Sequence, residues 1–228
     1  QALVPEQADA AALDAALRSA LEHDFLAPTL ASLAFVDLPS WVLPRLGQTT
    51  RGEALERAFE RASGGRLAQP FLDFGTAEGA GWRPLLLLNA TQQETGRRIV
   101  AAPVRIDRDL FLDAFDLHEL LHVDVRLSTA AHNSARFSYV SPAGRLATYP
   151  DDSGRGWIID GGYFENFAAA TALELVRGAL AAIRREHGDD ARVMPVIIQI
   201  SSDPAIGRLH LGPSGEPLER RDRARLDE

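Results

Sequence analysis

A carboxylate placed between an apolar strand and a glycine pair is the clearest group that could do chemistry. Asp160 follows the apolar run 157–159 and precedes Gly161 and Gly162. Active sites of open α/β sheets lie at strand ends of this kind, and the glycines allow a sharp turn. The dipole of a helix beginning near Glu165 would keep the carboxylate ionised, as a general base requires. The alternative is an ordinary Asp-Gly turn without a catalytic role.

A second pattern, His118-Glu119-x-x-His122, has the spacing of a zinc site. On a helix, histidines four residues apart could share one zinc ion, with Glu119 as the base. The longer metzincin pattern is not continued, because Val125 replaces its glycine and Ser128 replaces its third histidine. His132 or a distant Glu could still be the third ligand, so a zinc metallopeptidase is the second hypothesis.

The composition limits the class of protein. The chain has 228 residues, 46% hydrophobic and 25% charged, as expected for a single globular domain. Its formal net charge of -8 gives no reason to expect nucleic acid as a partner, and the absence of cysteine excludes disulfides and thiolate metal sites. No apolar run is long enough for a membrane-spanning helix. The start, 1–5, has neither Met nor a signal peptide, so we expect the chain to begin inside a longer protein.

The hydrophobic pattern predicts alternating helices and strands. Helices are expected over 6–22, 52–62, 116–122, 128–136 and 165–186, and strands over 84–90, 98–101, 123–127, 157–159 and 193–200. The continuous apolar runs are typical of strands buried on both faces. We therefore expect one α/β domain over 1–228 with a layered, mainly parallel central sheet, and a mobile polar tail over 203–228.

Residues 25–44 are apolar but interrupted by Pro28, Pro39 and Pro44. One interpretation is a buried irregular connection. The other is a surface that makes peripheral contact with a membrane or covers a lipid site, because exposed apolar surface usually has a function.

Three blocks of sequence resemble the patatin-like phospholipase family, in the same order. They are 87–96, 127–137 followed by 140–142, and 160–166. The likeness covers about residues 50–202, with the last block similar to the family's aspartate motif.

The resemblance implies a layered α/β/α fold and a lipid acyl hydrolase with a Ser–Asp dyad that acts through an acyl-enzyme. Asp160 would be the base, with Gly161, Gly162, Asn133 and Ser134 near a lipid or ester substrate. No metal or organic cofactor is implied. In the family, a glycine-rich oxyanion loop and a Gly-x-Ser-x-Gly nucleophile precede the segments seen here.

The chain departs from this pattern because it contains no Gly-x-Ser-x-Gly. Ser63 and Ser214 each have one of the two glycines, and both fit ordinary loops better than a nucleophile. We therefore expect the serine to lie upstream and this chain alone to be inactive. The third hypothesis is a non-catalytic module of the same fold that binds a membrane or a partner.

Overall fold

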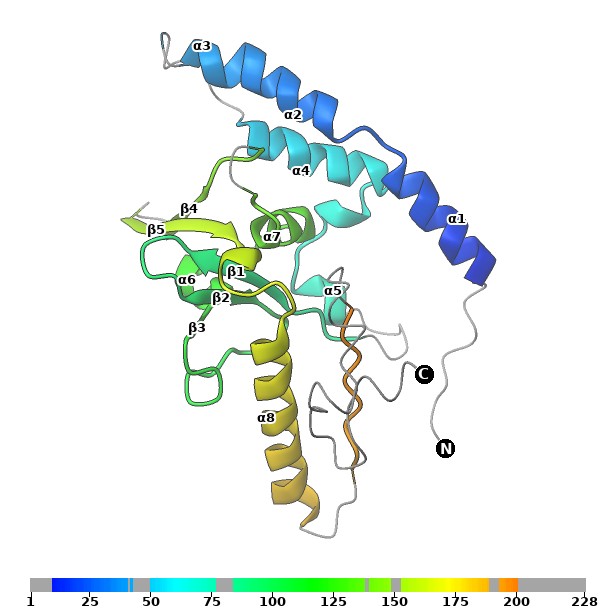
Figure 1. Ribbon diagram of the computed structural model, residues 1–228, viewed down its shortest axis with the longest axis vertical. Helices are drawn as coiled ribbons and strands as arrows, with labels where there is room; N and C mark the ends of the chain where they lie inside the picture. The colour runs from blue at the N-terminus through cyan, green and yellow to red at the C-terminus, as the bar shows by residue number, and fades with distance from the viewer. Residues whose placement is uncertain are drawn as a thin grey trace, which may run out of the picture. The chain divides into compact units, whose positions relative to one another are not determined.

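The structure is a computed structural model of the chain that describes residues 10–40, 42, 50–76, 84–137, 140–148, 153–188 and 193–200. Two compact units, Gln1–Gly178 and Ala179–Glu228, divide the chain, and each is described by itself. The first unit combines helices with a five-stranded sheet (Figure 1). The expected α/β class is therefore confirmed.

The sheet is mixed, with the strand order β3-β2-β1-β5-β4. Only β2 and β3 run parallel among these neighbours, whereas the sequence predicted a mainly parallel sheet. A tight turn closed by the Gly96 N–H, which donates to the Gln92 carbonyl (2.8 Å), joins β1 to β2 and makes them antiparallel. The strands are β1 (Leu88–Gln92), β2 (Arg98–Ala101), β3 (Ala114–Asp116), β4 (Gly144–Thr148) and β5 (Ser153–Asp160).

Strand β2 is buried on both faces. Ile99 and Ala101 belong to one apolar cluster, whereas Val100 and the following Ala102 belong to another. Successive side chains of a strand point to opposite faces, so each face of the sheet has its own core. The first cluster also contains Phe71, Leu117, Leu127, Leu146 and Ile158, and the second contains Ile106, Phe111 and Ala114.

Helices stack outward from one face of the sheet: α7 lies on β1 and β5, α4 packs on α7, and α2 packs on α4 (Figure 1). The Thr50 hydroxyl caps α4 by accepting from Glu53 N–H, and Gly64 and Gly65 end it with positive φ angles. The helices are α1 (Ala10–Leu21), α2 (Leu26–Ser32), the π-helical η1 (Leu33–Asp37), α3 (Leu38–Ser40), α4 (Arg51–Ala62), the 3₁₀ turn η3 (Arg66–Ala68), α5 (Asp73–Thr76), α6 (Leu117–Leu121), α7 (Leu127–Ser134), the 3₁₀ turn η4 (Gly161–Tyr163) and α8 (Ala169–His187).

Helix α8 is attached to the sheet through the buried Arg98 of β2. The guanidinium donates to Thr171 Oγ1 (2.7 Å) and to carboxylate oxygens of Glu174 and Asp113 (both 2.6 Å). Thr171 Oγ1 in turn donates to Asn89 Oδ1 of β1 (3.0 Å). Burial lowers the pKa of Arg98, but the two carboxylates outweigh it and raise the pKa above its ordinary value.

Three expected elements differ in the structure. The segment 25–44 is helical from Leu26 to Ser40, not irregular, while 41 and 43–49 lie outside the described residues. The expected strand 123–127 is absent, because Leu127 already begins α7 and Arg126 forms only an isolated bridge with Pro70. The predicted strand 84–90 is described as a strand only from Leu88.

The second unit includes the end of α8 and the segment 193–200. This segment was expected to be a buried strand, but it belongs to no helix or strand in the described part of the chain. Its apolar side chains are exposed, Ile200 to 90%. The expected tail, 203–228, lies outside the described residues. Among the described helices, none has the length and apolar character needed to cross a bilayer.

Candidate active site

Asp160 is the last residue of β5, at the strand end that the sequence predicted. Its Oδ1 accepts a hydrogen bond from Gly162 N–H (2.7 Å), and its own N–H donates to the Arg136 carbonyl (3.3 Å). No hydrogen bond from a described residue reaches Oδ2. One carboxylate oxygen therefore shapes the turn, and the other can accept a proton.

Gly161 holds the turn against the centre of the sheet. A side chain at this position would collide with the Asn89 carbonyl of β1, so only glycine lets the two segments approach this closely. The N–H groups of Phe164 and Glu165 donate to the Gly161 carbonyl (both 3.0 Å) and close the 3₁₀ turn. Backbone packing thus sets the position of the neighbouring Asp160.

A cavity of about 200 Å³ opens beside the carboxylate. The described residues that line it are Phe137, Asp160, Gly162, Tyr163 and Asn166. No serine or threonine is among them. The site therefore combines one carboxylate with two aromatic walls, an environment that suits an apolar substrate with a single polar centre.

The N-terminus of α8 donates hydrogen bonds to the carboxylate of Glu165, whereas the sequence led us to expect it near Asp160. The helix begins at Ala169, after a left-handed Ala168 (φ 50), rather than near Glu165. Both carboxylate oxygens of Glu165 accept from Ala170 N–H (3.1 and 3.2 Å). The expected start of this helix near Glu165 is therefore wrong, and the carboxylate that accepts from its first turn is that of Glu165.

Asn133 and Ser134, which the resemblance places beside the substrate, are not among the described lining residues of the cavity. Both belong to the last turn of α7, where the Asn133 side chain is buried and accepts from Arg136 Nε (2.6 Å). The structure instead places Phe137, Tyr163 and Asn166 at the cavity.

The His-Glu-x-x-His pattern does not form a helical pair of histidines. Asp116 caps α6 by accepting from the N–H groups of His118 and Glu119 (2.8 and 3.2 Å). The helix ends at Leu121, and His122 adopts a left-handed conformation (φ 58). The two rings therefore do not share one helix face, which was the premise of the zinc hypothesis. Among the described residues, no three His, Asp or Glu side chains gather closely enough to hold a metal ion.

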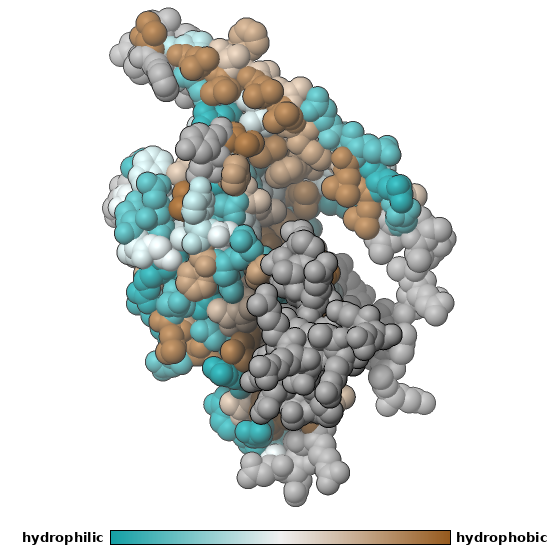
Figure 2. All heavy atoms as spheres, viewed as in Figure 1, coloured by the Kyte–Doolittle hydropathy of each residue, from teal (hydrophilic) through white to brown (hydrophobic). Residues whose placement is uncertain are grey.

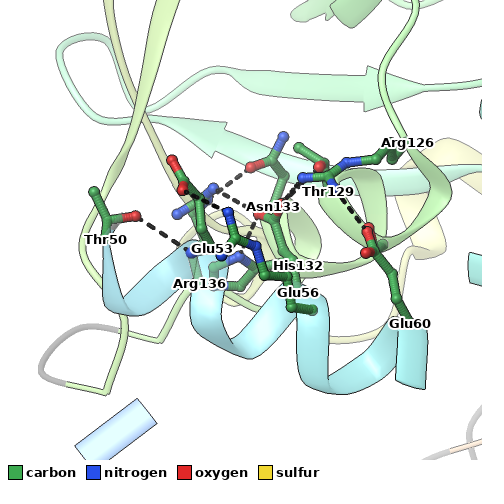
Figure 3. Close-up of polar contacts among 11 residues, drawn as sticks. Thr50, Glu53, Glu56, Glu60, Arg126, Thr129, His132, Asn133 and Arg136 are labelled. Carbon is green, nitrogen blue, oxygen red and sulfur yellow. Dashed lines mark hydrogen bonds and ion pairs between the residues drawn. The ribbon is translucent and has the colours of Figure 1, made fainter. Parts of the chain in front are cut away.

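A buried polar cluster joins α4 to α7 (Figure 3). The carboxylate of Glu56 accepts from Thr129 Oγ1 (2.7 Å), lies 2.8 Å from His132 Nδ1, and pairs with Arg136 Nη2 (3.4 Å). The other two guanidinium nitrogens of Arg136 also donate hydrogen bonds, Nε to Asn133 Oδ1 and Nη1 to the Pro142 carbonyl (2.9 Å). We call Glu56, Thr129, His132, Asn133 and Arg136 the interhelical cluster.

Burial and pairing change the ionisation of this cluster. Burial raises the pKa of Glu56, but hydrogen bonds from His132 and Thr129 and the positive charge of Arg136 outweigh it, so the pKa lies below its usual value. Burial lowers the pKa of His132 below its usual value, although the hydrogen bond that the ring donates to Glu56 opposes this shift. We therefore treat His132 at neutral pH as an uncharged ring whose Nδ1–H donates to an ionised Glu56.

The interhelical cluster also positions one side of the cavity. Arg136 supplies the carbonyl that receives the Asp160 N–H, and the next residue, Phe137, lines the cavity. Because the Arg136 side chain is held at several points, the backbone on this side of Asp160 is held as well. Glu56, which sequence analysis did not single out, thus belongs to the support of the site.

The lowered pKa of His132 predicts a loss of stability in mild acid. Below about pH 6.5 the unfolded chain takes up a proton on this histidine that the folded chain does not. The free energy of unfolding therefore decreases as the pH decreases. We expect the melting temperature to fall between pH 7 and 5.5, and to fall less in His132→Gln. His23→Gln, which removes an exposed histidine, is the control. Equal slopes in all three proteins would contradict the assignment.

Comparisons with known proteins do not assign the chain to a family. No protein-family model matches the sequence, and no curated protein or solved structure matches it significantly. The functional assignment therefore depends on the residues of the site and on the resemblance of the three blocks.

Proposed function

We propose that this chain carries the base of a serine-dependent lipid acyl hydrolase with a patatin-like fold. The observation that supports the proposal is the Asp160 carboxylate, which has one oxygen engaged in the turn and the other available beside a cavity with aromatic walls. The substrate would be a lipid carboxylic ester, whose acyl chain suits Phe137 and Tyr163. The described mixed sheet would be one part of the layered domain.

The chemistry follows from the position of the carboxylate. A serine hydroxyl attacks the ester carbonyl carbon and passes its proton to Asp160 Oδ2. The tetrahedral intermediate collapses, the alcohol leaves with that proton, and an acyl-enzyme remains. Water then attacks the acyl group, giving its proton to Asp160, and the serine recovers a proton as the acid departs. Because the sequence contains no Gly-x-Ser-x-Gly, the serine is proposed to come from residues outside it.

A chemical test needs no knowledge of the natural lipid. Protein expressed from its natural coding sequence is assayed with a short-chain nitrophenyl ester and then treated with a fluorophosphonate, which forms an adduct with activated serines. We expect hydrolysis, its loss on treatment, and one modified serine located by mass spectrometry. Absence of both hydrolysis and adduct would replace the hydrolase with the non-catalytic module, which the lack of a serine at the described cavity favours.

A further inference from the structure

The helical segment from Leu26 to Ser40 faces solvent with its apolar side chains. It buries the small polar side chains of Thr29 and Ser32, and its first helix, α2, packs on α4. Leu26, Leu30 and Leu38 are at least half exposed, and Phe35 is exposed to 81%. A surface helix of a globular protein normally has the opposite arrangement. Figure 2 shows the hydrophobic side chains along α2 and α3.

A π-helical turn keeps these side chains on one stripe. Leu30 and Phe35 are five residues apart, a spacing that would separate them on a regular α-helix. Between them begins η1, where the Leu38 N–H donates to the Leu33 carbonyl, five residues back. A π turn holds one more residue than an α turn, so positions five apart lie on one face. We call Leu26, Leu30, Phe35 and Leu38 the apolar stripe.

The charged side chains within residues 24–40 already have partners in the protein. Residues 24–40 contain no basic residue and only two acidic ones. Asp24 caps α2 by accepting from the N–H groups of Leu26 and Ala27 (both 2.9 Å), and Asp37 pairs with Arg51 of α4 (2.7 Å). The stripe itself therefore offers neither charge nor hydrogen-bonding side chains to a partner.

We propose that the apolar stripe inserts into the surface of a bilayer of zwitterionic lipids, with α2, η1 and α3 lying in the plane of the interface. Leu and Phe on one exposed face are typical of helices that lie at a membrane surface. The Lys and Arg residues that draw such helices to anionic lipids are missing from this segment, which favours neutral head groups.

The extent of the stripe favours lipid over a second copy of the chain. Four side chains that are half to four-fifths exposed present roughly 300–400 Å² of apolar surface, within the usual range for a single patch. A protein–protein interface of standard size covers about 800 Å² on each partner and contains Tyr, Trp or Arg at its centre. A bilayer requires neither that area nor those side chains.

Vesicle binding tests the proposal independently of catalysis. Protein from the natural coding sequence is sedimented with phosphatidylcholine vesicles, alone and with added phosphatidylglycerol. We expect the wild-type protein and Asp160→Asn to bind equally, without a gain from the anionic lipid. The double variant Leu30→Asn/Phe35→Asn should bind at least about tenfold more weakly, because two apolar side chains are lost from the contact.

The matched control replaces two other exposed apolar residues, Val104 and Leu112, which lie between β2 and β3. The variant Val104→Asn/Leu112→Asn should bind as the wild-type protein does, and circular dichroism should confirm that both double variants are folded. Lack of binding by the wild-type protein, unchanged binding by the stripe variant, or binding that requires phosphatidylglycerol would overturn the proposal. A wild-type dimer that dissociates in Leu30→Asn/Phe35→Asn, seen by light scattering, would assign the stripe to a second copy instead.

Discussion

Replacing Asp160 with Asn is expected to lower kcat for ester hydrolysis roughly 100- to 10,000-fold, with KM close to its wild-type value. The amide oxygen of Asn can still accept from Gly162 N–H, so the turn at the end of β5 should persist. What is lost is the anionic oxygen that takes the proton of the serine. Initial rates on a short-chain nitrophenyl ester, measured over a range of ester concentrations at equal protein concentration, give both constants.

Asp107→Asn is the matched control for this experiment. Asp107 Oδ1 accepts from the N–H two residues ahead, that of Asp109 (3.0 Å), just as Asp160 does in its own turn. Asp107 is exposed and is not among the described lining residues of the cavity. If both substitutions left turnover unchanged, Asp160 would be a turn-capping residue and the dyad would have to be abandoned.

Replacing Glu56 with Ala is expected to cost about 3–5 kcal/mol of the free energy of unfolding, because it leaves the buried guanidinium of Arg136 without its carboxylate. His132 and Thr129 also lose their acceptor. Glu56→Gln retains one acceptor oxygen and should have an intermediate effect. Urea unfolding followed by circular dichroism measures the difference.

Glu53 offers a control on the same helix. Its carboxylate lies 3.9 Å from Arg57, and both side chains of the pair are about half exposed. Glu53→Ala should therefore cost about 0–1 kcal/mol. A loss for Glu56→Ala no greater than that for Glu53→Ala would show that the interhelical cluster contributes little to stability.

Local patterns predicted the position of the candidate base correctly. The apolar run before Asp160 predicts a strand end, and the two glycines after it predict a turn. Both signals lie within a few consecutive residues, and the structure has both elements. Helix α4 was predicted for the same reason, since its apolar spacing and the glycines at its end are local features.

The environment of the base could not be predicted, because it depends on residues far apart in the sequence. Glu56 and His132 are 76 residues apart, and each alone resembles an ordinary helical residue. Glu56 and Glu60 are spaced by four on one helix, and His132 and Arg136 lie at the end of another, but nothing in the sequence states that these groups meet.

The helical structure of Leu26–Ser40 was not predicted, for a different reason. Its prolines suggested irregular backbone, yet Pro28 lies in the first turn of α2, where its missing N–H is tolerated, and Pro39 lies in the short α3. The π turn between them alters the period on which apolar patterns are recognised.

The attachment of α8 gives one helix two kinds of behaviour. Thr171 and Glu174, which bond to Arg98, both lie within its first two turns. From Ala179 onward the helix belongs to the second unit. Fraying from the C-terminal end can therefore proceed without breaking the bonds to β2, whereas opening at the other end must break them. Amide hydrogen exchange along α8 should accordingly be graded, with slow exchange confined to the turns next to the sheet.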